Sequence, residues 1–443
     1  MRLIGEPKNS SGRVAPSWSL VHTNFETLLR AEQRALLGGK PLVKQSGQPS
    51  VRWDIKIDRT EIVRSILAAC GSATKKKLLC GGTVVKFNGE EGVDGGGLTR
   101  EMWTLFRQRL FLPSPSAPAL FVTLACEAKQ LAGAAAAEDV SHENEVGFVP
   151  RSLSGLDSHQ KTQLLKDYEQ LGRLLLVVVT TGQALPSTFA PYVLTYLCAD
   201  DLAQLADCAA IGTTGSPAKH DAEKEAAAAL VAMEKMDKVR ADGLRNLIQT
   251  RIGSNMTMEE LCLGASTNVV VDTPAGRAAA VCHCIHEQLI ASRRPALQAM
   301  KQGFTYAADL RPALAMFTTQ ELTDLYLRQV WADSDQILRS FVDEGSGTPA
   351  WQYTMQTLQA LIEHWGNTGS EGQERLVQLL IWATGSDDLG DSLITIRPAQ
   401  SEAHMPSAST CARMIMLPPG VKTVEALNEK LVAAFRHTNF GRE

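Results

Sequence analysis

One cysteine near the carboxyl end of this 443-residue chain stands in a sequence context that favours chemistry. Cys411 follows the segment 406–410 (PSAST) and comes before the pair Pro418-Pro419, so prolines bracket a loop that leads into a strand. The small residues leave the sulfur little side-chain cover, and Arg413 adds a nearby positive charge. Solvent access and a neighbouring cation favour a nucleophilic thiolate. Cys411 is therefore the candidate nucleophile, and the alternative is a buried structural thiol.

A second group of metal-binding residue types lies at Cys282-His283-Cys284-Ile285-His286. On a helix, Cys282 and His286 would share a face and Cys284 would point away. The chain has no second pair of cysteines or histidines at the spacing that completes a tetrahedral site. We therefore expect a helix here and no metal ion or other cofactor.

The glycine-rich segment Gly92–Gly97 contains Asp94 and directly follows Glu90 and Glu91. A phosphate-binding loop would continue with Gly-Lys-Ser or Gly-Lys-Thr, which is absent here, and calcium loops space their carboxylates differently. The segment is better explained as a tight turn between a strand and a helix. We expect Arg100, just after it, to pair with a local carboxylate.

The elements that must position these residues follow from hydrophobic periodicity. Before residue 332 the pattern predicts strands at Val51–Ile57 and Thr83–Phe87, helices at Phe25–Leu37, Thr60–Cys70 and Thr99–Leu110, a buried helix at Asp167–Leu185, and a helix through Arg328 opened by a Thr318/Glu321 capping box. Leu131–Glu145 and Thr213–Asp242 resemble insertions, the second with an exposed helix around Ala226–Ala229.

After residue 348 the pattern predicts a small mixed module with helices at Met355–Trp365, Leu376–Trp382 and Val424–Phe435, strands at Leu393–Ile396 and Met414–Leu417, and a loop at Gly366–Gly372. Residues 333–348 are mostly polar and are the candidate hinge. We expect a lead-in segment at 1–50, a large body at 51–332, the hinge, and the module at 349–443.

Composition excludes several classes of protein. The formal charge is −4, so nothing favours a nucleic-acid partner. The longest apolar runs are far shorter than the roughly 20 residues of a membrane-spanning helix, and the first residues do not resemble a signal peptide. Nine cysteines, an odd number scattered over a long chain, indicate a reducing compartment rather than a disulfide scaffold. We expect a cytoplasmic or nuclear protein.

Several of these segments together resemble one family. The stretch 406–419 carries P-x-x-x-T-C followed by L-P-P, and 87–101 reads F-x-G-E-E-G-V-D-x-G-G-x-x-R-E. Further matches, in the same order, are Tyr168–Leu175, Phe317–Leu322, the turn Thr384-Gly385-Ser386, and a phenylalanine, Phe440, fourth from the end. Together they are similar to HECT-type ubiquitin ligases over about residues 50–443.

This resemblance implies an α+β, bilobal HECT fold, in which a flexible hinge joins a large, mostly helical N-lobe to a small α/β C-lobe. It implies a ubiquitin-protein ligase whose partners are a ubiquitin-conjugating enzyme charged with ubiquitin, ubiquitin itself and a substrate protein. Cys411 would accept ubiquitin as a thioester and pass it to a substrate lysine. Thr410 would shape the cysteine loop, and Phe440 would serve the second transfer.

The chain departs from the family's pattern at positions close to the cysteine. Ser409, Ala412 and Gly420 stand where many relatives carry His, Phe and Tyr, and the aromatic pair usual near 353–358 is missing. These departures leave open how firmly the cysteine loop is supported. The alternative function is therefore a catalytically weak or silent HECT-like scaffold that binds a conjugating enzyme.

A cysteine hydrolase is a third, less favoured possibility. It would need a histidine base in contact with the thiol, and neither His404 nor His437 has an obvious Asn or Asp to orient it. The sequence indicates no binding residues beyond the cysteine loop.

Overall fold

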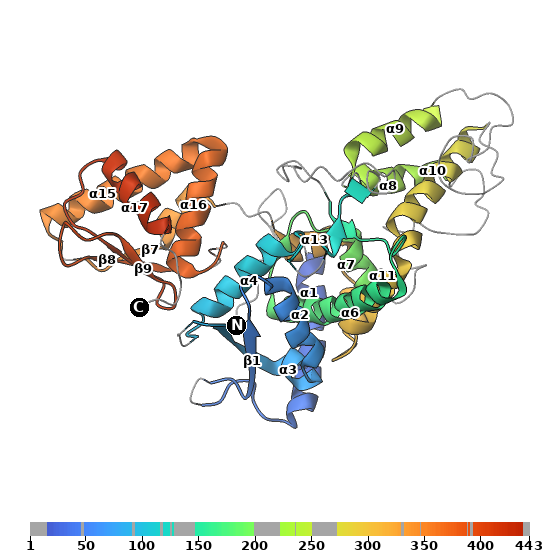
Figure 1. Cartoon of the computed structure of the whole chain (residues 1–443), viewed down its shortest axis with the longest axis horizontal. Coiled ribbons are helices and arrows are strands. Elements are labelled where there is room, and N and C mark those ends of the chain that lie inside the picture. The colour runs from blue at the N-terminus through green and yellow to red at the C-terminus, as the bar shows by residue number, and fades with distance from the viewer. Residues whose placement is uncertain are drawn as a thin grey trace. The chain divides into compact units, whose positions relative to one another are not determined.

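The computed structural model describes residues 16–45, 48–90, 94–115, 118–124, 126–127, 147–198, 222–234, 236–249, 273–328, 332–345, 347–387, 389 and 393–436. They form an α+β structure of many helices and small sheets (Figure 1). The chain divides into two compact units. The first comprises Met1–Val51, Ile66–Gly81 and Leu110–Arg328, and the second comprises Arg52–Ser65, Gly82–Arg109 and Gln329–Glu443. The lobe and hinge boundaries expected from the sequence stay a prediction.

The first unit is mainly helical. Its helices are α1 (Pro16–Leu37), α3 (Lys75–Cys80), α6 (Ser158–Thr181), α7 (Pro191–Cys198), α8 (Ala222–Glu234), α9 (Lys238–Gln249), α10 (Pro274–Leu289), η4 (Ala291–Arg293), α11 (Arg294–Phe304), α12 (Arg311–Leu314) and α13 (Thr319–Tyr326). Short strands pair β3 (Phe121–Val122) with β4 (Val149–Pro150), antiparallel, and β5 (Leu185–Pro186) with β6 (Leu327–Arg328), parallel. Helix α2 (Ile62–Ser72) runs from the second unit into the first.

Helix α6 is the buried helix that the sequence predicts, and its bounds follow from its caps. Asp157 begins it with a capping box to Gln160. Gly182 ends it at a φ of 69°, so the helix stops at Thr181 rather than at Leu185. The capping box expected at Thr318 and Glu321 is also confirmed, and it opens α13.

Helix α11 packs directly on α6 through two glycines. A Cβ added to Gly172 would lie 1.9 Å from the carbonyl oxygen of Met300. One added to Gly303 would lie 1.8 Å from the carbonyl oxygen of Glu169. Because backbone atoms cannot move aside as side chains do, only glycine fits at both positions.

Helices α8, α9 and α10 lie close together in the first unit (Figure 1). The helix expected around Ala226–Ala229 is present as part of α8, but the expectation that it is exposed is wrong. Ala226 and Ala229 are fully buried, and Ala226 packs with Ala278 of α10, because alanine lets two helices approach closely. The other expected insertion, at 131–145, lies outside the described residues.

The second unit contains a two-stranded sheet, β1 (Val51–Ile57) with β2 (Gly81–Phe87), and helix α4 (Gly97–Arg109). Arg59 joins these elements. Its guanidinium donates to Glu90 and, over 2.7 Å, to Glu101, and it lies 3.9 Å from the centre of the Phe87 ring. Burial lowers the pKa of Arg59, but the hydrogen bonds and negative charges of the two carboxylates raise it by more, so the net pKa is raised.

The carboxyl-terminal part of the second unit is a mixed sheet with helices. Its elements are α14 (Ser334–Ser340), β7 (Phe341–Asp343), α15 (Pro349–Asn367), α16 (Gly369–Thr384), β8 (Ile394–Pro398), β9 (Ser407–Ser409), β10 (Met414–Leu417) and α17 (Val424–Arg436). The strand order is β7-β8-β10-β9, with β8 parallel to both β7 and β10 and with β9 antiparallel to β10.

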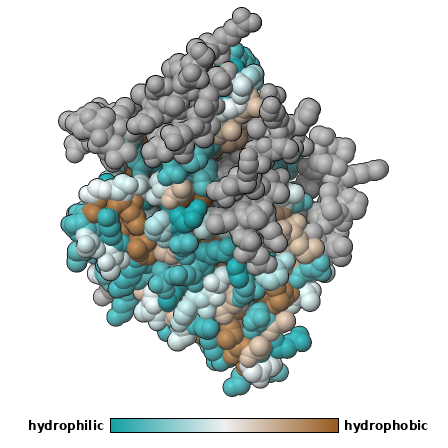
Figure 2. All heavy atoms as spheres, turned by 90° about the vertical axis from the view of Figure 1, so that its right-hand side faces the viewer, coloured by the Kyte–Doolittle hydropathy of each residue, from teal (hydrophilic) through white to brown (hydrophobic). Residues whose placement is uncertain are grey.

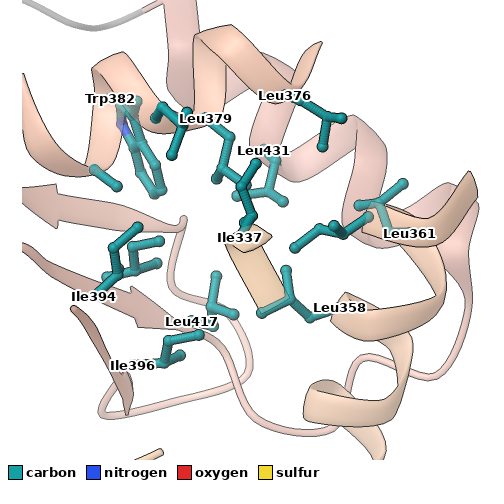
Figure 3. Packing of buried hydrophobic residues seen from close by; sticks show 14 of the residues in the cluster. Ile337, Leu358, Leu361, Leu376, Leu379, Trp382, Ile394, Ile396, Leu417 and Leu431 are labelled. Atoms are coloured by element: carbon teal, nitrogen blue, oxygen red, sulfur yellow. The ribbon is translucent and has the colours of Figure 1, made fainter. Parts of the chain in front are cut away.

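One hydrophobic core holds this sheet to its helices. Figure 3 shows Ile394 and Ile396 of β8 and Leu417 of β10 facing side chains from the helices, including Leu358, Leu379 and Leu431. Alternate residues of the strands are buried, as a sheet covered on one face requires. The expected loop at Gly366–Gly372 is wrong in extent, because α16 already begins at Gly369.

Among the described residues, the surface shows no sign of the long apolar segments that the sequence also lacks. On the face seen in Figure 2, hydrophobic residues form small groups among hydrophilic ones. Within the described ranges, we find no helix with the length and apolar character needed to span a membrane.

Candidate active site

Cys411 lies in the tight turn that joins strands β9 and β10. Ser409 and Met414 are paired across the two strands, so Thr410–Arg413 make the connection. The N–H of Arg413 donates to the carbonyl oxygen of Thr410 over 3.4 Å, and Arg413 has a φ of 50°. The left-handed conformation is unusual for a residue with a side chain, and here it closes the turn. Residues 407–409, expected in a loop, form the strand β9 instead.

The structure places Cys411 at the surface. Among the cysteines described, it alone is exposed, while Cys70, Cys80, Cys198 and Cys284 are buried and the others are half-buried. Burial raises the pKa of the Cys198 thiol to about 12 and raises that of Cys70 even further. A thiol that stays protonated at neutral pH is a poor nucleophile. Because it alone among them is exposed, Cys411 is the described cysteine that a partner in solution can reach most readily.

Thr410 is buried directly before the exposed cysteine. Its side-chain oxygen lies at the beginning of α4, where a Cβ added to Gly97 would come within 2.7 Å of it. Its carbonyl oxygen accepts a hydrogen bond from Arg100. Thr410 therefore anchors one end of the turn, which leaves Cys411 at its tip.

The expectation that Arg100 pairs with a local carboxylate is wrong. Its Nε donates to the carbonyl oxygen of Thr384 over 2.6 Å, and its Nη2 donates to that of Thr410. The nearby carboxylates have other partners, since Glu90 and Glu101 bind Arg59. The guanidinium fork is therefore available to join two backbone carbonyls that are far apart in the sequence.

Asp94 holds the glycine turn before α4. Its carboxylate accepts from the N–H groups of Gly96 at 2.7 Å, Val85 at 2.8 Å and Thr99 at 3.3 Å, and also from the Thr99 hydroxyl. This carboxylate is engaged with the backbone of the turn and the first turn of the helix. Such a role agrees with the structural interpretation of the Gly92–Glu101 motif.

Helix α4 contacts the end of α16 through a second arginine. Arg107 forms a bidentate ion pair with Asp387, and both side chains are more than nine-tenths buried. The Thr104 hydroxyl donates to the carbonyl oxygen of Gly385 over 3.2 Å. The turn Thr384–Asp387 is therefore bound to one side of α4 by backbone and side-chain bonds.

The segment around Cys282 belongs to α10, as expected. Cys284 is buried and Cys282 is half-buried. Burial, and secondarily the cation of Arg294, lower the pKa of His286. Among the residues with described positions, no three His, Cys, Asp or Glu side chains are grouped to hold a metal ion.

The family comparison agrees with this geometry. A family model described as HECT-domain (ubiquitin-transferase) matches residues 124–442, well over half of the chain. The chain belongs to the HECT family. No curated protein matches it. Membership of the HECT family confirms the resemblance seen in the sequence and implies a ubiquitin-conjugating enzyme and ubiquitin as partners.

The matched HECT region contains Thr410, Cys411 and Phe440, whereas the motif at 87–101 precedes it. Phe440 lies outside the described residues. The sequence alone did not assign Arg100, Arg107 or Asp387 to the surroundings of the cysteine. The HECT resemblance included both the Thr384 turn and the motif that contains Arg100, but it did not predict that the two are in contact.

Proposed function

We propose that this HECT-family chain is a ubiquitin-protein ligase that carries ubiquitin on Cys411. Family membership supports the chemistry, and the exposure of Cys411 is the observation that carries the proposal. A nucleophile that exchanges an acyl group between two proteins must be reachable by both. Among the described cysteines, Cys411 best meets this condition.

The reaction has two acyl transfers. In the first, the Cys411 thiolate attacks the thioester carbonyl carbon at the end of ubiquitin, and the cysteine of the conjugating enzyme leaves as a thiolate. In the second, a substrate lysine amine attacks the new thioester, an amide bond forms, and Cys411 leaves as a thiolate while the amine loses a proton to solvent. Thioester exchange is nearly isoenergetic, so positioning supplies much of the rate.

The other residues assigned from the sequence have supporting roles in this proposal. Thr410 shapes the turn that presents the sulfur, which its burial supports. Phe440 serves the transfer to lysine. The hinge proposed for 333–348 lets Cys411 meet first the donor thioester and then the acceptor amine. Because α14 and β7 pack in the carboxyl-terminal core, we place the bend at the start of this stretch, before α14.

A single-turnover assay with the full chain tests the proposal. A panel of conjugating enzymes is charged with ubiquitin, separated from ATP, and mixed with the chain. We expect a ubiquitin adduct that thiol reductants remove. It should be lost in Cys411→Ala and replaced in Cys411→Ser by an ester that resists reductants but is cleaved by hydroxide.

The matched control is Cys282→Ala, which removes a half-buried cysteine and should charge as the unmodified chain does. Failure of every conjugating enzyme to charge Cys411 would favour the silent scaffold instead. Hydrolysis of a preformed ubiquitin conjugate without ligation would favour a hydrolase.

A further inference from the structure

The backbone of one glycine turn lies against the Cys411 sulfur. A Cβ added to Gly97 would lie 2.8 Å from Sγ and 3.2 Å from the backbone nitrogen of Cys411, while one added to Gly95 would lie 3.5 Å from Sγ. No larger residue fits at Gly97 unless the cysteine turn moves. The start of α4 therefore forms one wall beside the sulfur, and that wall is backbone alone.

Arg100 holds this wall and the cysteine turn together. It lies one helical turn after Gly97, and it donates to the carbonyl oxygen of Thr410, which belongs to the peptide bond that leads into Cys411. Its Nε binds the carbonyl of Thr384, the last residue of α16. The bond to Thr384 fixes the plane of the rigid guanidinium, so its second donor holds the Thr410–Cys411 peptide in one direction relative to α16.

The environment of Arg100 indicates that this contact is specific. The side chain is half-buried, and burial together with the nearby Arg413 cation lowers its pKa, whereas Cys411 and Asp94 act in the opposite direction. Removing a cation from water and placing it near another cation costs free energy. The two hydrogen bonds from Arg100 to backbone carbonyls offset part of that cost.

We propose that Arg100 is a positioning residue for the Cys411 nucleophile. Its hydrogen bonds to the carbonyl oxygens of Thr384 and Thr410 hold the sulfur in the geometry used to accept ubiquitin. This role rests on the proposed ligase function. Arg100 does not exchange protons or form bonds with the acyl group. It fixes the Thr410–Cys411 peptide, so that Sγ is presented at a constant place beside the glycine turn.

The test uses Arg100→Ala in the full chain, with Arg109→Ala as the matched control. Arg109 lies on the same helix and carries the same charge, but it is exposed. The charging rate at saturating donor should fall at least about tenfold in Arg100→Ala, because small displacements of a nucleophile cost large factors in rate. The donor concentration at half-saturation should stay unchanged, and Arg109→Ala should charge normally.

A second readout uses no ubiquitin. Alkylation of Cys411 by iodoacetamide is followed by mass spectrometry of the peptide that contains it. Release of the turn from α4 should make the sulfur more accessible to this small reagent, so its alkylation rate should rise at least about twofold. Arg109→Ala should leave the rate unchanged. A loss of folding would be seen separately as an altered thermal unfolding transition.

The Arg100→Lys variant separates position from charge. Lysine keeps the cation but lacks the planar fork, so we expect slow charging and raised alkylation, as in Arg100→Ala. Normal charging by Arg100→Lys would overturn the positioning role in favour of charge alone.

If the rates of charging and of alkylation both rise in Arg100→Ala, the Arg100 contact slows ubiquitin transfer instead of supporting it. If both rates are unchanged, the contact does not position Cys411. Either result overturns the proposal. If the unmodified chain is never charged, the ligase function fails, yet the alkylation rates still show whether Arg100 holds the cysteine turn.

Discussion

Arg107 on α4 and Asp387 after α16 form an ion pair whose two side chains are both more than nine-tenths buried. The pair is bidentate, with Nε of Arg107 at 3.2 Å from Oδ2 of Asp387. A buried pair of this kind adds little net stability over an apolar pair, but the loss of one partner leaves a buried charge without its counter-charge. It therefore makes the contact between α4 and the carboxyl-terminal elements specific.

Asp387→Ala is expected to lower the free energy of unfolding by roughly 3–5 kcal/mol, because Arg107 would stay buried without a counter-charge. Urea unfolding followed by circular dichroism measures the change. The matched control is Glu344→Ala, which removes an exposed ion pair with Arg397 and should cost no more than about 1 kcal/mol. Equal effects of the two substitutions would contradict the interpretation of the buried pair.

Gly172→Ala is expected to destabilise the chain by several kcal/mol, about the upper end of single-residue effects. Its Cβ would meet the backbone oxygen of Met300 at 1.9 Å, so α6 and α11 would have to separate. Gly243→Ala on α9 is the control, since a Cβ there meets nothing within 4 Å. That change should raise the free energy of unfolding by about 0.5–1 kcal/mol, because alanine favours a helix.

Acidification from pH 7 to pH 5 is expected to destabilise the first unit partly through His286. Its pKa is lowered in the folded chain, mainly by burial and then by Arg294, so the unfolded chain binds the proton more readily just below pH 6.5. The stability linked to His286 is present above its unfolded pKa and is lost as the pH falls. His286→Gln should make the urea midpoint less dependent on pH, and an unchanged dependence would exclude this histidine as a cause.

Thr354→Val is expected to lower the free energy of unfolding by about 1–3 kcal/mol. The buried Thr354 hydroxyl accepts from the N–H of Val421 and donates to the carbonyl of Pro418, each over 3.1 Å, so valine leaves two buried backbone groups without that partner. Thr162→Val on the exposed face of α6 removes only a bond to its own helix and should cost no more than about 0.5 kcal/mol. A thermal or urea transition that is the same for both would contradict this difference.

Phe440→Ala is expected to separate the two acyl transfers. Charging of Cys411 should proceed normally, while discharge of the thioester to free lysine should slow at least about tenfold, equivalent to ~1.4 kcal/mol in the barrier. Pulse-chase assays measure both rates, with Thr438→Ala as the control in the same segment. Slowed charging in Phe440→Ala would oppose a role limited to the second transfer.

The sequence by itself determined the family, the candidate nucleophile and most helices and strands. These features are local: the periodicity of α6 and α17, the capping box at Thr318, and the small residues around Cys411 each act within a few positions. Local patterns also predicted β1 with its observed bounds. The exposure of Cys411 follows from the same kind of signal, because a short turn between two strands keeps its tip at the surface.

Only the tertiary structure decided what holds the cysteine in place. Arg100 binds the carbonyl of Thr410, which lies 310 positions away in the chain. Every residue carries a carbonyl oxygen, so such an acceptor leaves no signal in the sequence, and the carboxylates near Arg100 suggested the wrong partner. The burial of Ala226 and the close approach of Gly172 to Met300 could not be predicted for a similar reason. A small residue indicates close packing only when the element packed against it is known.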